Sequence, residues 1–311
     1  MMPMLLAGLV SLLLAFAFLA PLESMRWWSR CDADRVLGEL TRAEIEPDGA
    51  TPLSPQPRRF VVYLSGIGAV DGSTSSRRER AVLDEIAERL PDVAITADVF
   101  PYAVDNRGLT QRASMWFWKA LRRLQRIPVA KFPSYLINLR NALRVLVSAD
   151  PRYGPTYNLA VAQEVAASLT RHGYDWEERP PVTVVGYSGG GQVALGCCWY
   201  LEALGVPVSV VSIGGVLSDD PALQRVQHVW HFYGSKDRTH MLGPLVFPGR
   251  WPTAPLSDWH KAKQAGRITL RTIGPMKHMG GRDYFDRHHT DAAGVSYRQL
   301  TVNALVEALS E

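Results

Sequence analysis

Short apolar runs rich in β-branched residues alternate with segments of helical periodicity through most of this chain, and this alternation restricts the fold more than any other feature. The predicted strands read RFVVYLSG, VAITADVF, PVTVVGYS, VPVSVVSIGG, VQHVWHFYG and RITLRTIG. The predicted helices are SSRRERAVLDEIAERL and residues 156–171, 192–204 and 296–309. Strands joined through helices pair in parallel, and the helices then cover both faces of the sheet. We therefore expect an α/β fold with a mostly parallel central sheet and helices on both faces.

The first 25 residues are predicted to form an N-terminal transmembrane anchor, with a signal peptide as the alternative. Residues 1–22 carry no charge, and residues 4–22 would form a helix of about 28 Å, close to the thickness of a bilayer core. No basic region precedes the apolar run, and its small-x-small site, Ala15-Phe16-Ala17, lies inside the run, which favours an uncleaved anchor. Arg26 and Arg30 follow the run, so the positive-inside rule places the body on the cytoplasmic side. Cleavage of a signal peptide would instead yield a secreted protein.

Residues 26–58 are predicted to be a polar and proline-rich tether, and residues 59–311 the folded domain. Four prolines between positions 46 and 57 favour an extended segment over a packed element. With 47% hydrophobic and 21% charged residues, the chain has the composition of an ordinary globular protein.

A basic and aromatic insertion at about 102–150 interrupts the alternation. Residues 106–149 contain Arg and Lys but no Asp or Glu, and include the run MWFWKALRRLQR. One interpretation is a solvated helical insertion. The other is a surface, within residues 112–144, that lies against anionic lipid headgroups and covers the active site. No recognisable nucleic-acid-binding module accompanies the charge, so no nucleic-acid partner is predicted.

The segment GYSGG, residues 186–190, connects a predicted strand to a predicted helix. A G-x-S-x-G motif in that context places its serine on a tight turn that only small neighbours allow. The turn raises the Ser188 side chain above the sheet, near a helix N-terminus that stabilises developing negative charge. Ser188 is therefore a candidate nucleophile, which needs a base and a group to orient that base.

Asp237 and His278 are the candidate partners of Ser188. Asp237 lies in SKDR after one predicted strand, and His278 lies in PMKHMGG after the next. Both are at carboxyl ends of parallel strands, where sites form in open α/β sheets. The order Ser, Asp, His and the segments GYSGG, YGSKDR and KHMGGRDYF resemble the α/β-hydrolase family over about residues 59–311.

This resemblance implies a Ser-His-Asp triad and an oxyanion hole. Ser188 would attack an acyl carbonyl, His278 would transfer the proton, and Asp237 would fix the imidazole tautomer. The oxyanion hole would use the backbone N–H of Gly189 and one from SGIG, either Gly66 or Ile67. The sequence departs from the family in the short connection between SIGG and VQHVW, where a lid is often inserted.

Several alternatives to these assignments stay open in the sequence. Asp219 or Asp220 could replace Asp237, and other candidate bases are His240, His260, His288 and His289. Asp286, His288 and His289 could suggest a metal site, although polar loops often contain such groups without a metal. Residues 189–194 match G-x-G-x-x-A, but the expected acidic residue about 20 positions later is missing, which argues against a nucleotide. No cofactor or metal is therefore predicted. Cys197 and Cys198 are interpreted as small buried residues.

The sequence thus predicts a membrane-anchored serine hydrolase that cleaves carboxylic esters or thioesters through an acyl-enzyme. The anchor and the basic insertion favour lipid-like acyl substrates. The alternative is a catalytically silent α/β-hydrolase-like scaffold that binds a partner at the membrane.

Overall fold

The computed structural model describes residues 57–69, 76–102 and 132–311. Their six strands form one sheet in the order β2-β1-β3-β4-β5-β6, and every neighbouring pair is parallel. The strands are β1 (Arg59–Leu64), β2 (Val93–Thr96), β3 (Val182–Tyr187), β4 (Val208–Ile213), β5 (Val229–Gly234) and β6 (Ile268–Gly274). All six predicted strands are present, and the parallel pairing is confirmed.

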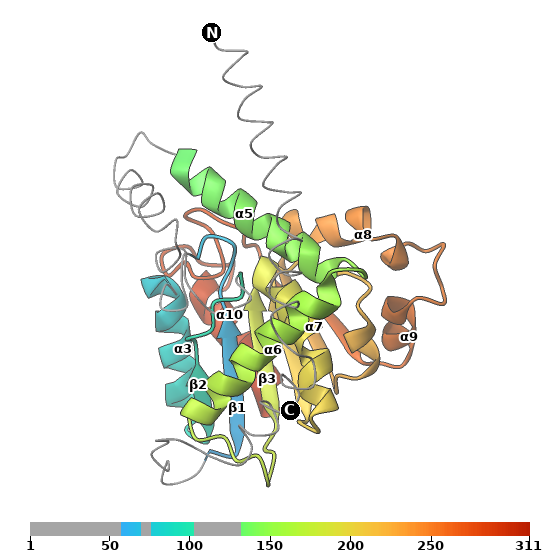
Figure 1. Cartoon of the computed structure of the whole chain (residues 1–311). Coiled ribbons are helices and arrows are strands. Elements are labelled where there is room, and N and C mark those ends of the chain that lie inside the picture. The colour runs from blue at the N-terminus through green and yellow to red at the C-terminus, as the bar shows by residue number, and fades with distance from the viewer. Residues whose placement is uncertain (1–56, 70–75, 103–131) are drawn as a thin grey trace.

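Helices cover both faces of this sheet (Figure 1). One face packs against α3 (Arg77–Arg89) and α10 (Tyr297–Ser310). The other packs against α6 (Gly154–Arg171), α7 (Gly189–Ala203) and α9 (Asp258–Gln264). Alternate β1 residues serve the two layers: Phe60 and Val62 lie in one core and Val61 and Tyr63 in the other. The predicted α/β class, with helices on both faces, is confirmed.

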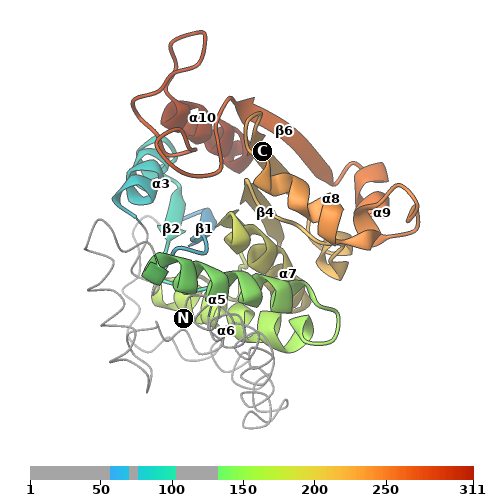
Figure 2. The same cartoon turned by 90° about the horizontal axis from the view of Figure 1, so that it is seen from above.

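Helix α5 (Phe132–Ala149) forms an additional layer over α6 and α7 (Figure 2). These residues belong to the predicted insertion at about 102–150, for which a solvated helix is one interpretation. The side chains of Ile137, Asn141 and Val145 are buried, so this part of the insertion belongs to the body of the domain. The more basic stretch, which contains Lys119, Arg122, Arg123 and Arg126, lies outside the described residues.

The connection from β4 to β5 contains only the short 3-10 helix η2 (Pro221–Gln224), so the predicted absence of a lid there is confirmed. The connection from β5 to β6 contains short helices that the sequence analysis did not predict. It contains η3 (Thr239–Met241), α8 (Leu242–Val246), η4 (Pro248–Arg250) and α9. Prolines at 244, 248, 252 and 255 keep these elements too short to show a periodic pattern.

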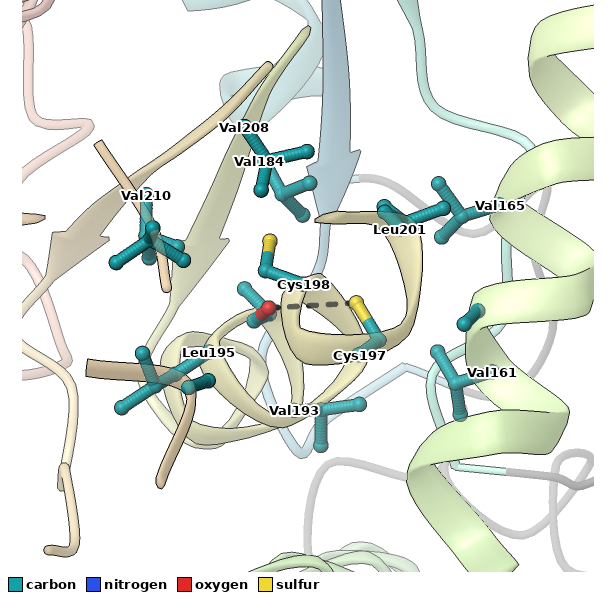
Figure 3. Close-up of a cluster of buried hydrophobic side chains, with 14 of the residues drawn as sticks. Val161, Val165, Val184, Val193, Leu195, Cys197, Cys198, Leu201, Val208 and Val210 are labelled. Atoms are coloured by element: carbon teal, nitrogen blue, oxygen red, sulfur yellow. Dashed lines mark hydrogen bonds between the residues drawn. The ribbon is translucent and has the colours of Figure 1, made fainter. Parts of the chain in front are cut away.

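Cys197 and Cys198 are buried in the core, as predicted, with Cys198 directed toward the sheet and Cys197 toward α6 (Figure 3). The Cys197 thiol donates a hydrogen bond to the carbonyl oxygen of Ala194 at 3.3 Å. Neighbouring aliphatic side chains, Val184 and Val208 among them, fill the space around the two sulfurs. Burial raises the pKa of Cys198, which keeps this thiol protonated and unreactive.

Among the described residues, none of the helices combines the length and apolar character needed to span a bilayer. The predicted anchor (1–25) and all but the last two residues of the predicted tether (26–58) lie outside the described residues.

Candidate active site

Ser188 occupies a strained turn between β3 and α7. Its backbone has φ 54° and ψ −124°, a region that non-glycine residues seldom adopt. A methyl group at Gly186 would lie 2.4 Å from the backbone of Gly190, and one at Gly190 would lie 2.5 Å from the carbonyl oxygen of Leu64. The two glycines are therefore steric requirements of the turn, as the motif predicted. The Ser188 amide donates to the Ile213 carbonyl oxygen at 2.9 Å, which fastens the turn to β4.

The structure brings the three predicted catalytic residues together from separate strand ends. The Ser188 hydroxyl lies 2.8 Å from His278 Nε2, and His278 Nδ1 lies 2.9 Å from Asp237 Oδ2. The Asp237 side chain is fully buried, and that of His278 is 11% exposed. A nucleophile, a base and an orienting carboxylate thus form one continuous chain of hydrogen bonds.

Asp237 is held as a carboxylate. Burial raises its pKa, but hydrogen bonds from His278 and Tyr284 and the charge of His278 outweigh burial, and the net pKa lies below its ordinary value. The Tyr284 hydroxyl donates to Oδ2 at 2.6 Å, and the Thr239 amide donates to Oδ1 at 2.7 Å. Tyr284 in turn accepts from the Gly234 amide at 2.9 Å. The carboxylate is therefore ionised at neutral pH and fixed in orientation.

The loop that carries His278 is fastened on two sides. The Tyr187 ring stacks on the imidazole at a centroid distance of 5.6 Å, and its hydroxyl donates to the His278 carbonyl oxygen at 2.5 Å. Arg78 on α3 forms a two-pronged ion pair with Asp283 of the same loop, with N–O distances of 2.9 and 2.6 Å. These contacts restrict the positions that the imidazole can take.

The loop after β1 contains the predicted oxyanion-hole residues Gly66 and Ile67 and lies beside Ser188. A methyl group at Gly66 would lie 3.5 Å from Ser188 Cβ, and one at Gly189 would lie 2.7 Å from Ile67 Cγ2. The Ser65 carbonyl accepts from the Tyr102 hydroxyl at 2.7 Å and the Gly66 carbonyl from the Ala69 amide at 3.0 Å. In a trans peptide the N–H points away from the C=O of the same peptide unit. The Gly66 amide therefore points away from the Tyr102 hydroxyl, and the Ile67 amide points away from the Ala69 amide.

Asn141 on α5 holds the far side of that loop. Its side-chain amide donates to the carbonyl oxygens of Ile67 and Ala69 at 2.7 and 2.8 Å. The Asn141 side chain is fully buried, so water does not compete with the two carbonyls for its amide. The helix that the sequence assigned to an insertion therefore positions the predicted oxyanion loop.

A cavity of about 280 Å³ opens onto Ser188 and His278. Gly66 and Ile67 line one side, and Tyr187 and Phe285 contribute aromatic surface. Asn138 of α5 lies on its wall, so α5 borders the cavity. The cavity is at the small end of the range for ligand sites, so it would bury a modest part of a large substrate.

The alternative acids and bases lie elsewhere. Asp219 accepts from the Trp259 amide at 2.5 Å, and Asp220 accepts from the Ala222 amide at 2.9 Å as the N-cap of η2. His240 stacks on Tyr233 with a centroid distance of 4.3 Å, and His260 bonds to Ser257. Neither aspartate replaces Asp237 in this geometry.

Of the three residues that could suggest a metal site, Asp286 and His289 contact each other. His289 Nδ1 lies 2.5 Å from Asp286 Oδ2, while His288 Nε2 accepts from Arg287. In the part of the chain that the structure describes, no three His, Cys, Asp or Glu side chains are grouped as metal ligands.

The sequence matches no family model, and no curated protein matches it. Solved structures with a similar arrangement include a dienelactone hydrolase-like promiscuous phosphotriesterase from metagenomic libraries. That protein is 13% identical, with a TM-score of 0.44 over 82% of this chain and 87% of its own. A dienelactone hydrolase from Anabaena variabilis is 16% identical, with a TM-score of 0.37 over 85% and 86% of the two chains. Likeness at this level is limited to the arrangement of strands and helices.

Proposed function

We propose that this protein is a serine hydrolase that cleaves carboxylic esters or thioesters through an acyl-enzyme intermediate. The observation that carries the proposal is the continuous chain from the Ser188 hydroxyl through His278 to the buried Asp237 carboxylate. A strained serine turn lowers the stability of the folded state by about 1–3 kcal/mol. A catalytically silent scaffold gives no reason for this loss of stability.

In the first half-reaction, Ser188 Oγ attacks the acyl carbonyl carbon while His278 Nε2 takes the hydroxyl proton. Asp237 stabilises the imidazolium through Nδ1–H. The amides of Gly189 and of Gly66 or Ile67 would donate to the oxyanion. The tetrahedral intermediate collapses when the bond to the leaving group breaks and His278 protonates the departing alkoxide or thiolate. Water then repeats the sequence on the acyl-enzyme, which releases the acid and restores Ser188.

A lipid-like acyl substrate is the class that the predicted anchor and basic insertion favour. The small cavity agrees with a substrate of which only the region around the scissile bond is enclosed. The remainder of an acyl chain would extend along the surface. No cofactor or metal enters the proposed reaction, because His278 makes each proton transfer and the backbone amides stabilise the oxyanion.

Hydrolysis of a water-soluble p-nitrophenyl ester and of an acyl thioester tests the proposal. Wild-type protein should release the chromophore with a burst equal to the enzyme concentration, and Ser188→Ala should lose turnover by about 10⁴-fold or more. Ser235→Ala, at an exposed serine beside β5, is the matched control and should retain full activity. Equal turnover in the Ser188→Ala variant would refute the proposal.

A further inference from the structure

The connection from β5 to β6 exposes an unusual amount of apolar surface. Six large apolar side chains within residues 241–256 are exposed: Met241, Leu242, Leu245, Val246, Trp251 and Leu256. Leu245 is 70% exposed and Leu256 is 80% exposed. Single exposed apolar residues are ordinary, but a cluster on one short segment marks a surface that binds a partner.

Five of these six side chains lie on η3, on α8 or directly after η4, and Leu256 follows in the loop before α9. Helix α8 contacts both η3 and η4, and the Trp251 indole N–H donates to the Pro244 carbonyl oxygen at 2.7 Å. The indole is thereby fixed beside α8, with its ring 44% exposed. Tryptophan with a bonded N–H and an exposed ring is well suited to a boundary between water and an apolar phase.

The same end of the molecule is positively charged at its surface. Five exposed cations lie on the two loops that carry Asp237 and His278: Lys236, Arg238, Lys277, Arg282 and Arg287. The acids of residues 235–257 and 275–289 are Asp237, Asp283 and Asp286, and all three are buried. Within these two ranges the exposed charge is therefore positive, and the acids that follow them, Asp258 and Asp291, are half-buried.

The apolar and cationic groups lie on the connections that follow β5 and β6, at the end of the sheet where the cavity opens, although none of them lines the cavity itself. Met279, 61% exposed, follows His278 directly and lines the cavity that opens onto Ser188. Figures 1 and 2 show α8 at the same end of the molecule as α5, which borders that cavity. We name the six apolar and five cationic side chains the entrance rim.

We propose that the entrance rim docks on the surface of an anionic lipid bilayer, with Leu245 and Leu256 among the acyl chains and the cations at the headgroups. Apolar side chains beside cations, without exposed acids, match the acyl and phosphate layers of such a surface. A second copy of this chain fits less well, because a two-fold contact would place the same five cations against one another. The docking would direct the cavity toward the membrane, and it does not depend on the reaction at Ser188.

A fluorescent label on the rim tests the docking in the full chain reconstituted into vesicles. Leu245→Cys, carrying an environment-sensitive nitrobenzoxadiazole, would be prepared with Cys31→Ser; Cys197 and Cys198 are buried. Glu178→Cys, exposed in the connection that precedes β3 at the opposite end of the sheet, is the control label. The vesicles would contain equal parts phosphatidylcholine and phosphatidylglycerol.

Quenching by nitroxides on the lipid acyl chains should be several-fold stronger for the label at 245 than for the label at 178. Iodide in the aqueous phase should show the reverse order. High salt or vesicles of phosphatidylcholine alone should weaken the lipid quenching at 245, because screening or removing anionic charge weakens the attraction. A label at Leu256→Cys should repeat the result and would show that one substitution had not disturbed the fold.

Strong iodide quenching of the labels at 245 and 256 in anionic vesicles would overturn the proposal, because the rim would then lie in water. Shielding of both labels from iodide and from the lipid quenchers would also overturn it, because a protein partner or second copy would then cover the rim. Lipid quenching that is unchanged in neutral vesicles would contradict the role of the five cations.

Discussion

At the Asp237 carboxylate, three donors from different parts of the chain converge on two oxygens. His278 and Tyr284 share Oδ2, and the Thr239 amide takes Oδ1. The charge is neutralised by partial positive charges on every side, which is why a buried acid keeps a lowered pKa. Such a carboxylate can stabilise an imidazolium at His278 without accepting its proton.

Replacement of either partner of Ser188 should disable turnover. Asp237→Asn is expected to lower kcat by about 10³- to 10⁴-fold, because the amide favours the wrong imidazole tautomer, and His278→Ala should cost at least as much. Steady-state kinetics with the p-nitrophenyl ester measures both. Retained turnover in Asp237→Asn, with loss in Asp219→Asn, would assign the acid to the connection after β4 instead.

Asp220 should make the protein less stable as the pH rises. Burial raises its pKa to about 6, so the folded state holds a proton that the unfolded state has lost above about pH 4. Its contribution to the free energy of unfolding is therefore greatest below pH 4 and falls by about 2 kcal/mol between pH 4 and pH 6. Urea unfolding across this range should show that decrease, and Asp220→Asn should remove it. Identical pH slopes in the two proteins would contradict the raised pKa.

At the scale of elements, α5 is a structural part of the site. Its Asn141 side chain holds the two carbonyls of the loop after β1, while Asn138 reaches the cavity wall. The other end of the site depends on α3, whose Arg78 binds the loop that carries His278. The loops at the strand ends thus supply the reacting groups, and two helices far apart in sequence hold these loops in position.

Asn141→Ala should therefore impair catalysis as well as stability. The change leaves two loop carbonyls without their donor, which should cost about 1–3 kcal/mol of stability. A displaced oxyanion loop should lower kcat by about 10- to 100-fold with little change in KM. Thermal melts and ester kinetics measure the two effects, with Leu146→Ala, at an exposed position on the same helix, as the control. An unchanged kcat in a destabilised Asn141→Ala variant would limit Asn141 to a purely structural role.

The strands, their parallel pairing and the positions of Ser188, Asp237 and His278 could be predicted from the sequence because each depends on a local pattern. Buried parallel strands are continuously apolar, and the glycines of GYSGG indicate a tight turn that leaves no room for larger side chains. The contributions of Asn141, Tyr284 and Arg78 could not be predicted in this way. Each acts through a hydrogen bond to a residue more than 40 positions away, and no local pattern specifies that partner.

Helix α5 shows why the insertion was interpreted too simply. Its sequence carries Arg140 and Arg144, which suggested solvent or a membrane. In the structure Arg144 is buried, and Arg140 donates to the Tyr102 carbonyl oxygen at 3.0 Å. A long cationic side chain can be buried or hydrogen-bonded within the protein itself. Charge alone does not distinguish such a side chain from one that faces solvent or a membrane.

At the scale of the whole molecule, we expect the predicted anchor to be separable from the folded domain. Every described residue that lines the proposed site lies between Ser65 and Phe285, so we expect the reaction not to require residues 1–55. The anchor at residues 4–22 remains a prediction, as does the cytoplasmic placement of the body.

The full chain should remain in the membrane fraction through high-salt and carbonate washes, because apolar burial in a bilayer does not depend on salt. A chain that begins at Gln56 should be released from that fraction by high salt and retain its ester hydrolysis. Sedimentation followed by immunoblotting and an activity assay measures both. A mature N-terminus at Phe18 would instead show signal cleavage and place the enzyme outside the cytoplasm.

The central claim is that Ser188 is the nucleophile, and covalent trapping tests it most directly. A fluorophosphonate probe should form one adduct, which peptide mass spectrometry should locate at Ser188. Ser188→Ala should form no adduct while its thermal midpoint remains close to that of the wild-type protein. Normal labelling of the folded Ser188→Ala variant, or an adduct on a different residue of the wild type, would contradict the account.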